Sequence, residues 1–282
     1  MRFSRLLLCT LAGCLLTGLA KAAEPAKRPN FVFIVSEDNS VHYLRLYGHK
    51  LGVTPNIERL AAEGLTFNHA FSGAPVCSVA RTTLATAMHA PRVGFQYHRK
   101  SALASLPPGV KPWSTVLREQ GYYATNNSKT DYNFKVDMKQ AWDMSSRKAT
   151  WRNRPDKSMP FFHMQSFADS HESSLHFPIK QLEKPTTTLP TEVDLPPYFP
   201  DTPIMRYTMA RYYDRMRIID GHVGRIINQL REDGLLENTF VFYFGDHGGV
   251  LPRSKGYAYE SGLHVPFVVR IPENFKQLVD HK

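Results

Sequence analysis

The sequence predicts an α/β protein in which a large, mostly parallel or mixed central sheet is flanked by helices. Two observations lead to this prediction. Continuous apolar runs of strand length alternate along the chain with amphipathic stretches of helical period. Several of these runs also end in a polar cluster, and ligands of α/β proteins bind beyond the carboxyl ends of the strands. With 282 residues, 42% of them hydrophobic, the chain can bury a sizeable core.

Five strands are predicted, and the first of them shows the pattern best. Residues 30–36 form a continuous apolar run, which is typical of a central strand covered on both faces. Residues 160–167 have the same character. The remaining strands are expected at residues 122–126, 239–244 and 265–270.

Four helices are predicted from apolar spacing and from start and stop signals. The first begins at residues 54–56 and has Ile57, Leu60, Ala61 and Leu65 on one face. Two shorter helices cover residues 82–88 and 113–120. The longest covers residues 205–230, with apolar side chains every three or four positions: Met209, Tyr212, Met216, Ile219, Val223, Ile226 and Leu230. Residues 180–203, rich in Pro and Thr, are expected to be a surface loop beside a substrate pocket.

The N-terminus has the features of a cleaved secretory signal at residues 1–22. Arg2 and Arg5 precede an apolar run, and a small-x-small site follows at residues 20–22. A periplasmic or secreted protein of residues 23–282 is therefore expected. A lipoprotein box ending at Cys14 is the alternative, but the apolar run continues past Cys14. No later stretch reaches the roughly 18 apolar residues that a membrane span needs.

The charge of the chain is basic and evenly spread. The formal net charge is +10, and without residues 1–22 the chain keeps 32 basic and 25 acidic residues. Such a surplus suits an anionic substrate, although ordinary solubility charge is an alternative. Nucleic acid is not expected as a partner, because the basic residues are scattered and no binding motif is present.

Cys77 is the single cysteine beyond the signal segment, so it has no partner for a disulfide. It opens the run Cys-Ser-Val-Ala-Arg at residues 77–81, after a proline at residue 75. This arrangement predicts a turn feeding a helix start, where anions bind well. A small buried hydrophobe is the alternative interpretation.

Four polar clusters follow predicted strands or turns and would meet at one edge of a doubly wound sheet. They are Glu37 with Asp38, residues 77–81, Ser170 with His171, and Asp246 with His247. Acidic residues at two strand ends make an oxygen-rich site, which favours Ca²⁺ or Mg²⁺ over zinc. Each pair alone could be structural, because Asp is common in turns and helix caps.

Residues 77–81 resemble the activation motif of the sulfatase family, Cys-x-Pro-x-Arg. In that family the cysteine is oxidised to formylglycine, and the hydrated aldehyde is the nucleophile. Cys77 and Arg81 match the motif, and Val79 stands where the family usually has proline. The resemblance implies an alkaline-phosphatase-like fold and a formylglycine-generating or anaerobic maturation enzyme as a partner.

The resemblance also implies a Ca²⁺ site. The first strand of the family ends in an Asp-Asp pair that binds calcium, and Glu37 and Asp38 occupy those places. A later strand ends in Asp-Asn or Asp-His, which Asp246 and His247 match. The matured Cys77 would lie at the same metal.

Further family motifs imply the residues that hold the sulfate together with Arg81. Lys129 matches the lysine of the family's Gly-Lys-Trp-His segment, whereas Asp131 stands where the family has histidine. His171 falls on a sulfate-contacting histidine, and Lys255 falls on a second lysine. The amino-acid pattern around Lys255 is similar to that of the heparan N-sulfatase branch.

The resemblance runs from about residue 30 to the end of the chain. It implies a hydrolase of sulfate esters or sulfamates on a sulfated carbohydrate, and the usual smaller C-terminal subdomain is not expected in this chain. Two alternatives remain. One is a catalytically impaired relative that binds sulfated glycans, suggested by Val79 and Asp131. The other is a metal-dependent phosphohydrolase of the same superfamily, which would be expected to carry a Ser or Thr nucleophile and more metal-binding side chains.

Overall fold

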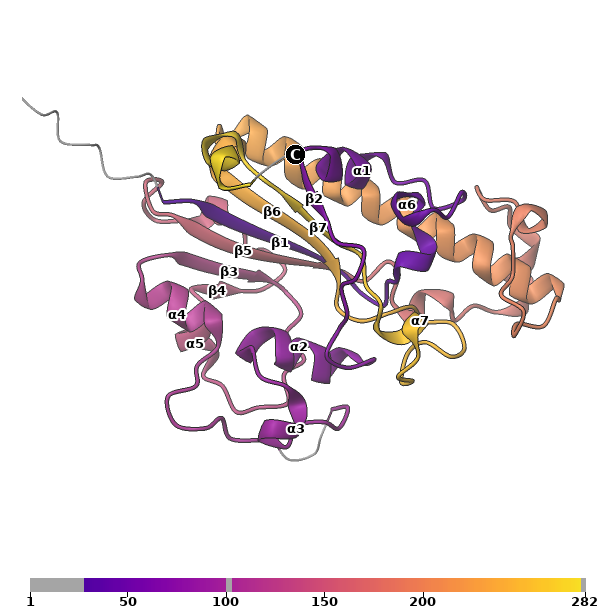
Figure 1. The fold of residues 1–282 in the computed structure, drawn as a ribbon, viewed down its shortest axis with the longest axis horizontal. Helices are drawn as coiled ribbons and strands as arrows, with labels where there is room; N and C mark the ends of the chain where they lie inside the picture. Colours follow the sequence, from indigo (N-terminus) through magenta and orange to yellow (C-terminus); the bar gives the residue numbers. More distant parts are fainter. Residues whose placement is uncertain (1–27, 100–102, 280–282) are drawn as a thin grey trace, which may run out of the picture.

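The computed structural model describes residues 28–99 and 103–279, and within them it shows one mixed seven-stranded sheet (Figure 1). The signal segment and Cys14 lie outside the described residues. The sheet order is β2-β7-β6-β1-β5-β3-β4. The strands are β1 (Asn30–Ser36), β2 (Gly64–Thr66), β3 (Tyr123–Asn127), β4 (Met144–Ser145), β5 (Phe161–Phe167), β6 (Thr239–Gly245) and β7 (Phe267–Arg270).

Strand β1 lies in the centre of the sheet and runs parallel to both of its neighbours, β5 and β6. Val32, Ile34 and Val35 are fully buried, as expected for a strand covered on both faces. Strand β7 runs antiparallel to β6 and to the short edge strand β2, which makes the sheet mixed. The predicted strand positions are confirmed to within two residues at each end, and the largest difference is at β7, which starts two residues later than expected.

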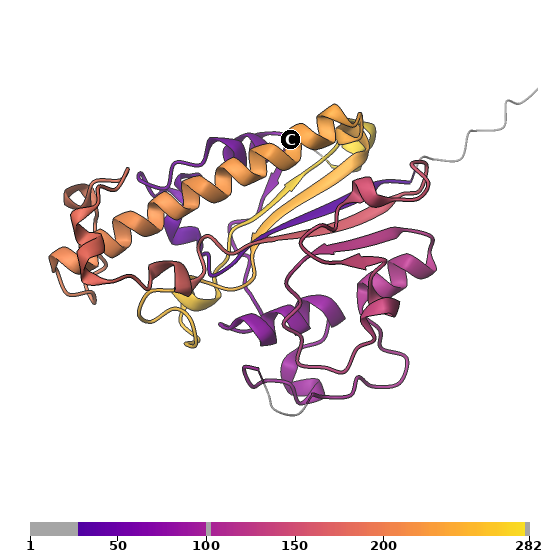
Figure 2. The ribbon, with the colours of Figure 1, turned by 180° about the vertical axis from the view of Figure 1, so that it is seen from behind.

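The helices form a layer on each face of the sheet. Figures 1 and 2 show α6 and α1 on one face and α2, α4 and α5 on the other. The helices are α1 (Pro55–Ala62), α2 (Cys77–Thr86), α3 (Ala90–Val93), α4 (Trp113–Glu119), α5 (Met138–Ala141), α6 (Pro203–Glu232) and α7 (Glu260–Leu263). None of the described helices is long and apolar enough to cross a membrane.

Helix α6 supplies the largest apolar stripe of the core. The Thr202 side chain accepts a hydrogen bond from the Met205 amide, and Pro203 occupies the first turn, so the helix begins two residues before the expected start at residue 205. All seven apolar positions named for residues 205–230 are buried. Residues 180–203 form a connection with short 3₁₀ turns at Ile179–Glu183 and Pro190–Glu192.

Two parts of the sequence prediction differ from the structure. Leu65 was expected on the first helix, but that helix ends at Ala62 and Leu65 lies in β2. The reason is Gly64: a Cβ there would lie 1.9 Å from the Val269 carbonyl oxygen, so glycine allows the chain to pair closely with β7. The helix expected at residues 82–88 begins earlier, at Cys77 itself.

A cavity of about 500 Å³ lies between α2 and the sheet. Its walls include ring side chains from three strands and from the chain after β2, namely Phe33, Phe67, Phe71, Phe242, Phe244 and Phe267. The cavity opens to solvent, since Phe67 and Phe71 in its wall are exposed.

His163 in β5 gives the stability of the fold a pH dependence. Its side chain is buried, with Nδ1 2.8 Å from Thr125 Oγ1, and burial lowers its pKa to about 4. In the unfolded chain the pKa returns to about 6.5. The free energy of unfolding therefore has its full value above about pH 6.5. It falls by on the order of 3 kcal/mol as the pH drops from 6.5 to 4, because the unfolded chain binds a proton that the buried ring does not.

The His163→Gln variant should show a smaller loss of unfolding free energy between pH 7 and pH 4 than the parent protein. Urea denaturation at a series of pH values measures this difference. Equal slopes for the parent and the variant would contradict a neutral, buried His163.

Candidate active site

The segments that follow β1 and β6 are joined by backbone and side-chain hydrogen bonds. The Asp38 amide donates to Asp246 Oδ1 at 3.0 Å, and the His247 amide donates to the same oxygen at 3.0 Å. The Glu37 amide donates to the Phe167 carbonyl at the end of β5. Since β1, β5 and β6 are parallel neighbours, their carboxyl ends bring these residues to one edge, as the sequence predicted.

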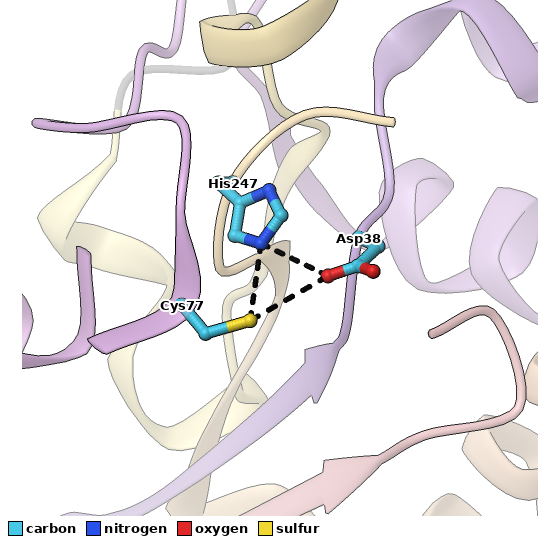
Figure 3. Close-up of side chains that lie close together, drawn as sticks. All are labelled: Asp38, Cys77 and His247. Carbon is cyan, nitrogen blue, oxygen red and sulfur yellow. Dashed lines mark hydrogen bonds and ion pairs between the residues drawn. The ribbon is translucent and has the colours of Figure 1, made fainter. Parts of the chain in front are cut away.

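Asp38, Cys77 and His247 converge on one point at this edge (Figure 3). His247 Nε2 lies 2.9 Å from Asp38 Oδ1 and 3.3 Å from Cys77 Sγ, and the two latter atoms are 3.7 Å apart. All three residues are fully buried. Cys77 reaches this point because it is the first residue of α2, so its side chain lies at the helix N-terminus.

Arg81 lies one turn further along α2 and neutralises two buried acids. Its Nε donates to Asp246 Oδ2 at 3.0 Å, and its terminal nitrogens lie 3.6 Å from Glu37 Oε1 and 3.2 Å from Ser166 Oγ. The Arg81 side chain is 1% exposed. The Asp246 and Glu37 charges overcome the effect of burial and raise the pKa of Arg81, so it stays a cation.

Two lysines and a histidine complete the positive rim of the site. Lys129 Nζ lies 2.7 Å from Glu37 Oε2, and Lys255 Nζ lies 2.8 Å from Asp38 Oδ2 and 3.4 Å from His171 Nε2. The His171 ring is held at Nδ1 by Ser173 Oγ at 2.9 Å. Its hydrogen bond with Cys77 raises the pKa of His171, since it favours the protonated ring beside a thiolate.

The charges of the cluster determine the protonation of Cys77. Burial acts against a thiolate, but hydrogen bonds from His171 and His247 outweigh it and lower the pKa of Cys77 to about 7. Burial also acts against a charged His247, but Asp246 and the hydrogen bond to Asp38 raise its pKa to about 10. In the unmodified protein the groups around Cys77 therefore favour its thiolate form.

The donor atoms fit a divalent cation. Cys77 Sγ, Asp38 Oδ1 and His247 Nε2 lie within 4.8 Å of one another. The sulfur, nitrogen and oxygen atoms as they stand suit zinc, whereas Ca²⁺ prefers a set of oxygen ligands. The carboxylates of Glu37 and Asp246, which the sequence also predicts as metal ligands, form ion pairs with Arg81.

Sequence reasoning missed two residues that approach the start of α2. His98 Nδ1 lies 3.0 Å from Ser78 Oγ, and the Arg99 amide donates to the same hydroxyl at 2.9 Å. The Arg99 guanidinium forms two hydrogen bonds with Asp131, at 3.2 and 3.1 Å. Asp131, which stands in the place of the family's histidine, is thus held by Arg99. No motif around His98 marks it in the sequence.

The Tyr212 hydroxyl is a third contribution that the sequence did not reveal. Tyr212 was predicted only as part of the apolar stripe of the long helix, and it is fully buried there. Its hydroxyl donates to the Asp38 carbonyl oxygen. Helix α6 therefore supports the loop of the site directly from the core.

The family model described as Sulfatase matches residues 29–282, nearly the whole of the described chain. The chain belongs to the sulfatase family. The family predicted from residues 77–81 is therefore confirmed.

Two curated relatives extend this finding. An ulvan-active sulfatase of Formosa agariphila is 35% identical over 292 residues, which are 89% of this chain and 48% of that protein. The N-sulphoglucosamine sulphohydrolase of Homo sapiens is 24% identical over 308 residues, which are 95% of this chain and 57% of that protein. The chain spans about half the length of the curated relatives it matches.

A solved structure shows the same fold. The phosphonate monoester hydrolase of Agrobacterium radiobacter superposes with a TM-score of 0.68 at 18% identity, over 87% of this chain and 68% of that one. This likeness confirms the predicted alkaline-phosphatase-like α/β architecture.

Proposed function

We propose that this sulfatase-family chain hydrolyses sulfate esters or sulfamates on a sulfated carbohydrate. The observation that carries the proposal is the cluster of Arg81, Lys129, His171 and Lys255 around the buried side chain of Cys77. A sulfate ester is a monoanion, and its transition state develops further charge on the leaving group. Fixed cations in a buried site stabilise such charge.

Each proposed role follows from the position of a side chain. Lys129 and Lys255 would bind the sulfate oxygens, and Arg81 would keep Glu37 and Asp246 ionised and in place. His171, whose Nδ1 accepts a hydrogen bond from the Ser173 amide at 3.3 Å, would carry a proton at Nε2 and donate it to the leaving oxygen or nitrogen. Hydrated formylglycine at position 77 would supply the oxygen nucleophile. Ca²⁺ held by Asp38, His247 and neighbouring carboxylates would draw negative charge from the sulfate.

The substrate class and location are part of the same proposal. One relative is named for activity on ulvan and another for N-sulphoglucosamine, so a sulfated glycan is the substrate class we propose. Residues 1–22 would direct export to the periplasm or the outside of the cell. A maturation enzyme would act on Cys77 before the chain is exported and before folding buries the side chain.

Release of inorganic sulfate tests this function. The protein, coexpressed with a formylglycine-generating enzyme, should release sulfate from sulfated oligosaccharides, lose this activity after chelation and regain it with Ca²⁺. A phosphate monoester assayed in parallel tests the phosphohydrolase alternative. Glycan binding without sulfate release from a fully matured protein would support the impaired relative instead.

A further inference from the structure

The loop between β6 and α7 presents Arg253, Tyr257 and Tyr259 next to the site, and Tyr198 from the segment before α6 lies against Arg253. Arg253 precedes Lys255 by two residues, so the two Cα atoms lie within about 7 Å of each other. The Arg253 guanidinium lies over the Tyr198 ring at 4.6 Å and over the Tyr259 ring at 4.4 Å. The Tyr257 ring stacks with the Tyr259 ring, with 6.3 Å between the centroids.

The backbone of this loop is fixed although its side chains are exposed. The Gly256 amide donates to the Pro75 carbonyl at 2.8 Å, which links the loop to the turn before Cys77. Ser261 Oγ donates to the Arg253 carbonyl at 2.8 Å. Arg253 has φ 66°, in the left-handed region, which costs a non-glycine residue about 1 kcal/mol. The arginine is therefore held in one place by the surrounding structure.

The polar edge of the Arg253 guanidinium is free of protein partners among the residues that the structure describes. Within residues 28–99 and 103–279, no carboxylate forms an ion pair with it and no acceptor binds its N–H groups. Stacking on tyrosine uses the face of a guanidinium and leaves the N–H donors in its plane available for a planar anion. Tyr198, Tyr257 and Tyr259 remain 46%, 59% and 48% exposed, so ring surface is available beside this edge.

We propose that Arg253, Tyr198, Tyr257 and Tyr259 form a subsite for the sugar next to the one that loses sulfate. Arg253 would bind a second anionic group on that neighbouring sugar, either a carboxylate or a sulfate, and the tyrosines would pack against its ring. Lys255 would meanwhile contact the sulfate that is cleaved. This inference rests on the proposed function, because it places the cleaved sulfate beside Lys255.

Calorimetry with defined sugars, carried out in the Cys77→Ala background so that no probe is hydrolysed, tests the subsite without turnover. The probes are glucosamine sulfate, a heparin disaccharide with one sulfate and one carboxylate, its carboxyl-reduced analogue, and a disulfated disaccharide. Arg253→Gln should weaken binding of the carboxylated and disulfated disaccharides about tenfold or more, since a charge-assisted hydrogen bond is lost. Binding of glucosamine sulfate should not change. The two disaccharides together show which anion Arg253 prefers.

Two further variants serve as controls. Arg253→Lys keeps the charge but loses the planar fork, so it should recover only part of the affinity. Arg231→Gln removes another exposed arginine, on α6, and should leave all four affinities unchanged.

Three results would overturn the subsite. In Arg253→Gln, unchanged affinity for both anionic disaccharides excludes a contact. An equal loss for glucosamine sulfate and the disaccharides shows that Arg253 only positions Lys255. If the parent protein releases sulfate from glucosamine sulfate while either result holds, the subsite fails and the proposed function stands. If the parent neither binds a probe nor releases sulfate, both fail.

Discussion

Replacing Cys77 by alanine is expected to lower sulfate release by about a thousandfold or more, because the variant lacks the nucleophile. Cys77 is fully buried at the first turn of α2 and lies 3.3 Å from His247 Nε2, so no other side chain can take its place without rearrangement. Substrate affinity should persist, since Lys129, His171 and Lys255 remain. Steady-state sulfate release and calorimetry measure the two quantities separately.

The mass of the peptide that contains Cys77 is the control for this result. In the active protein it should be lower than that of the thiol form by the exchange of sulfur for oxygen and the loss of two hydrogens. Val79 occupies the position of the usual proline, so Val79→Pro should give at least as much converted peptide. Full activity in Cys77→Ala, or in a protein whose Cys77 remains a thiol, would contradict the proposed nucleophile.

The Arg81→Met variant is expected to lose about 3–5 kcal/mol of unfolding free energy, because it leaves buried carboxylates without their partner. The Arg81 side chain is 1% exposed, and those of Asp246 and Glu37 are 1% and 5% exposed. Methionine keeps much of the length of the side chain but carries no charge. Urea denaturation, followed by circular dichroism, measures the loss.

Arg99→Met is the matched control for this prediction. Arg99 also pairs with an acid, Asp131, but its side chain is 54% exposed, so solvent screens the pair. The expected loss is below about 1 kcal/mol. Comparable losses of unfolding free energy in the two variants would contradict the idea that burial makes the Arg81 ion pairs more important for stability than the exposed Arg99 pair.

The elements that the sequence revealed are those with a strong periodic signal. Residues 31–35 are all apolar because β1 is covered on both faces, and α6 is 30 residues long with an apolar stripe along it. Strands β2 and β4 have three and two residues, too few to show any period. Their pairing depends on contacts with distant segments, such as the approach of Gly64 to Val269.

The residues of the site can likewise be separated into those that the sequence marks and those that it does not. Glu37, Asp38 and Asp246 could be found because each follows a strand that the sequence marks. The contact of His98 with Ser78 and the position of Arg253 over Tyr198 each involve a loop whose course has no periodic signal. Such contacts follow from the tertiary fold, so only the structure could reveal them.

The central position of β1 has a consequence for how the chain folds. Its hydrogen-bonded neighbours lie far away in the sequence: Phe31 pairs with Phe162 and with Phe240, so β1 stays unpaired until most of the chain has been synthesised. Closing such long loops costs entropy before any native contact compensates for it. Folding should be slow and concerted, with an apolar strand exposed to aggregation in the meantime, so chaperone binding to residues 30–36 of the nascent chain is expected.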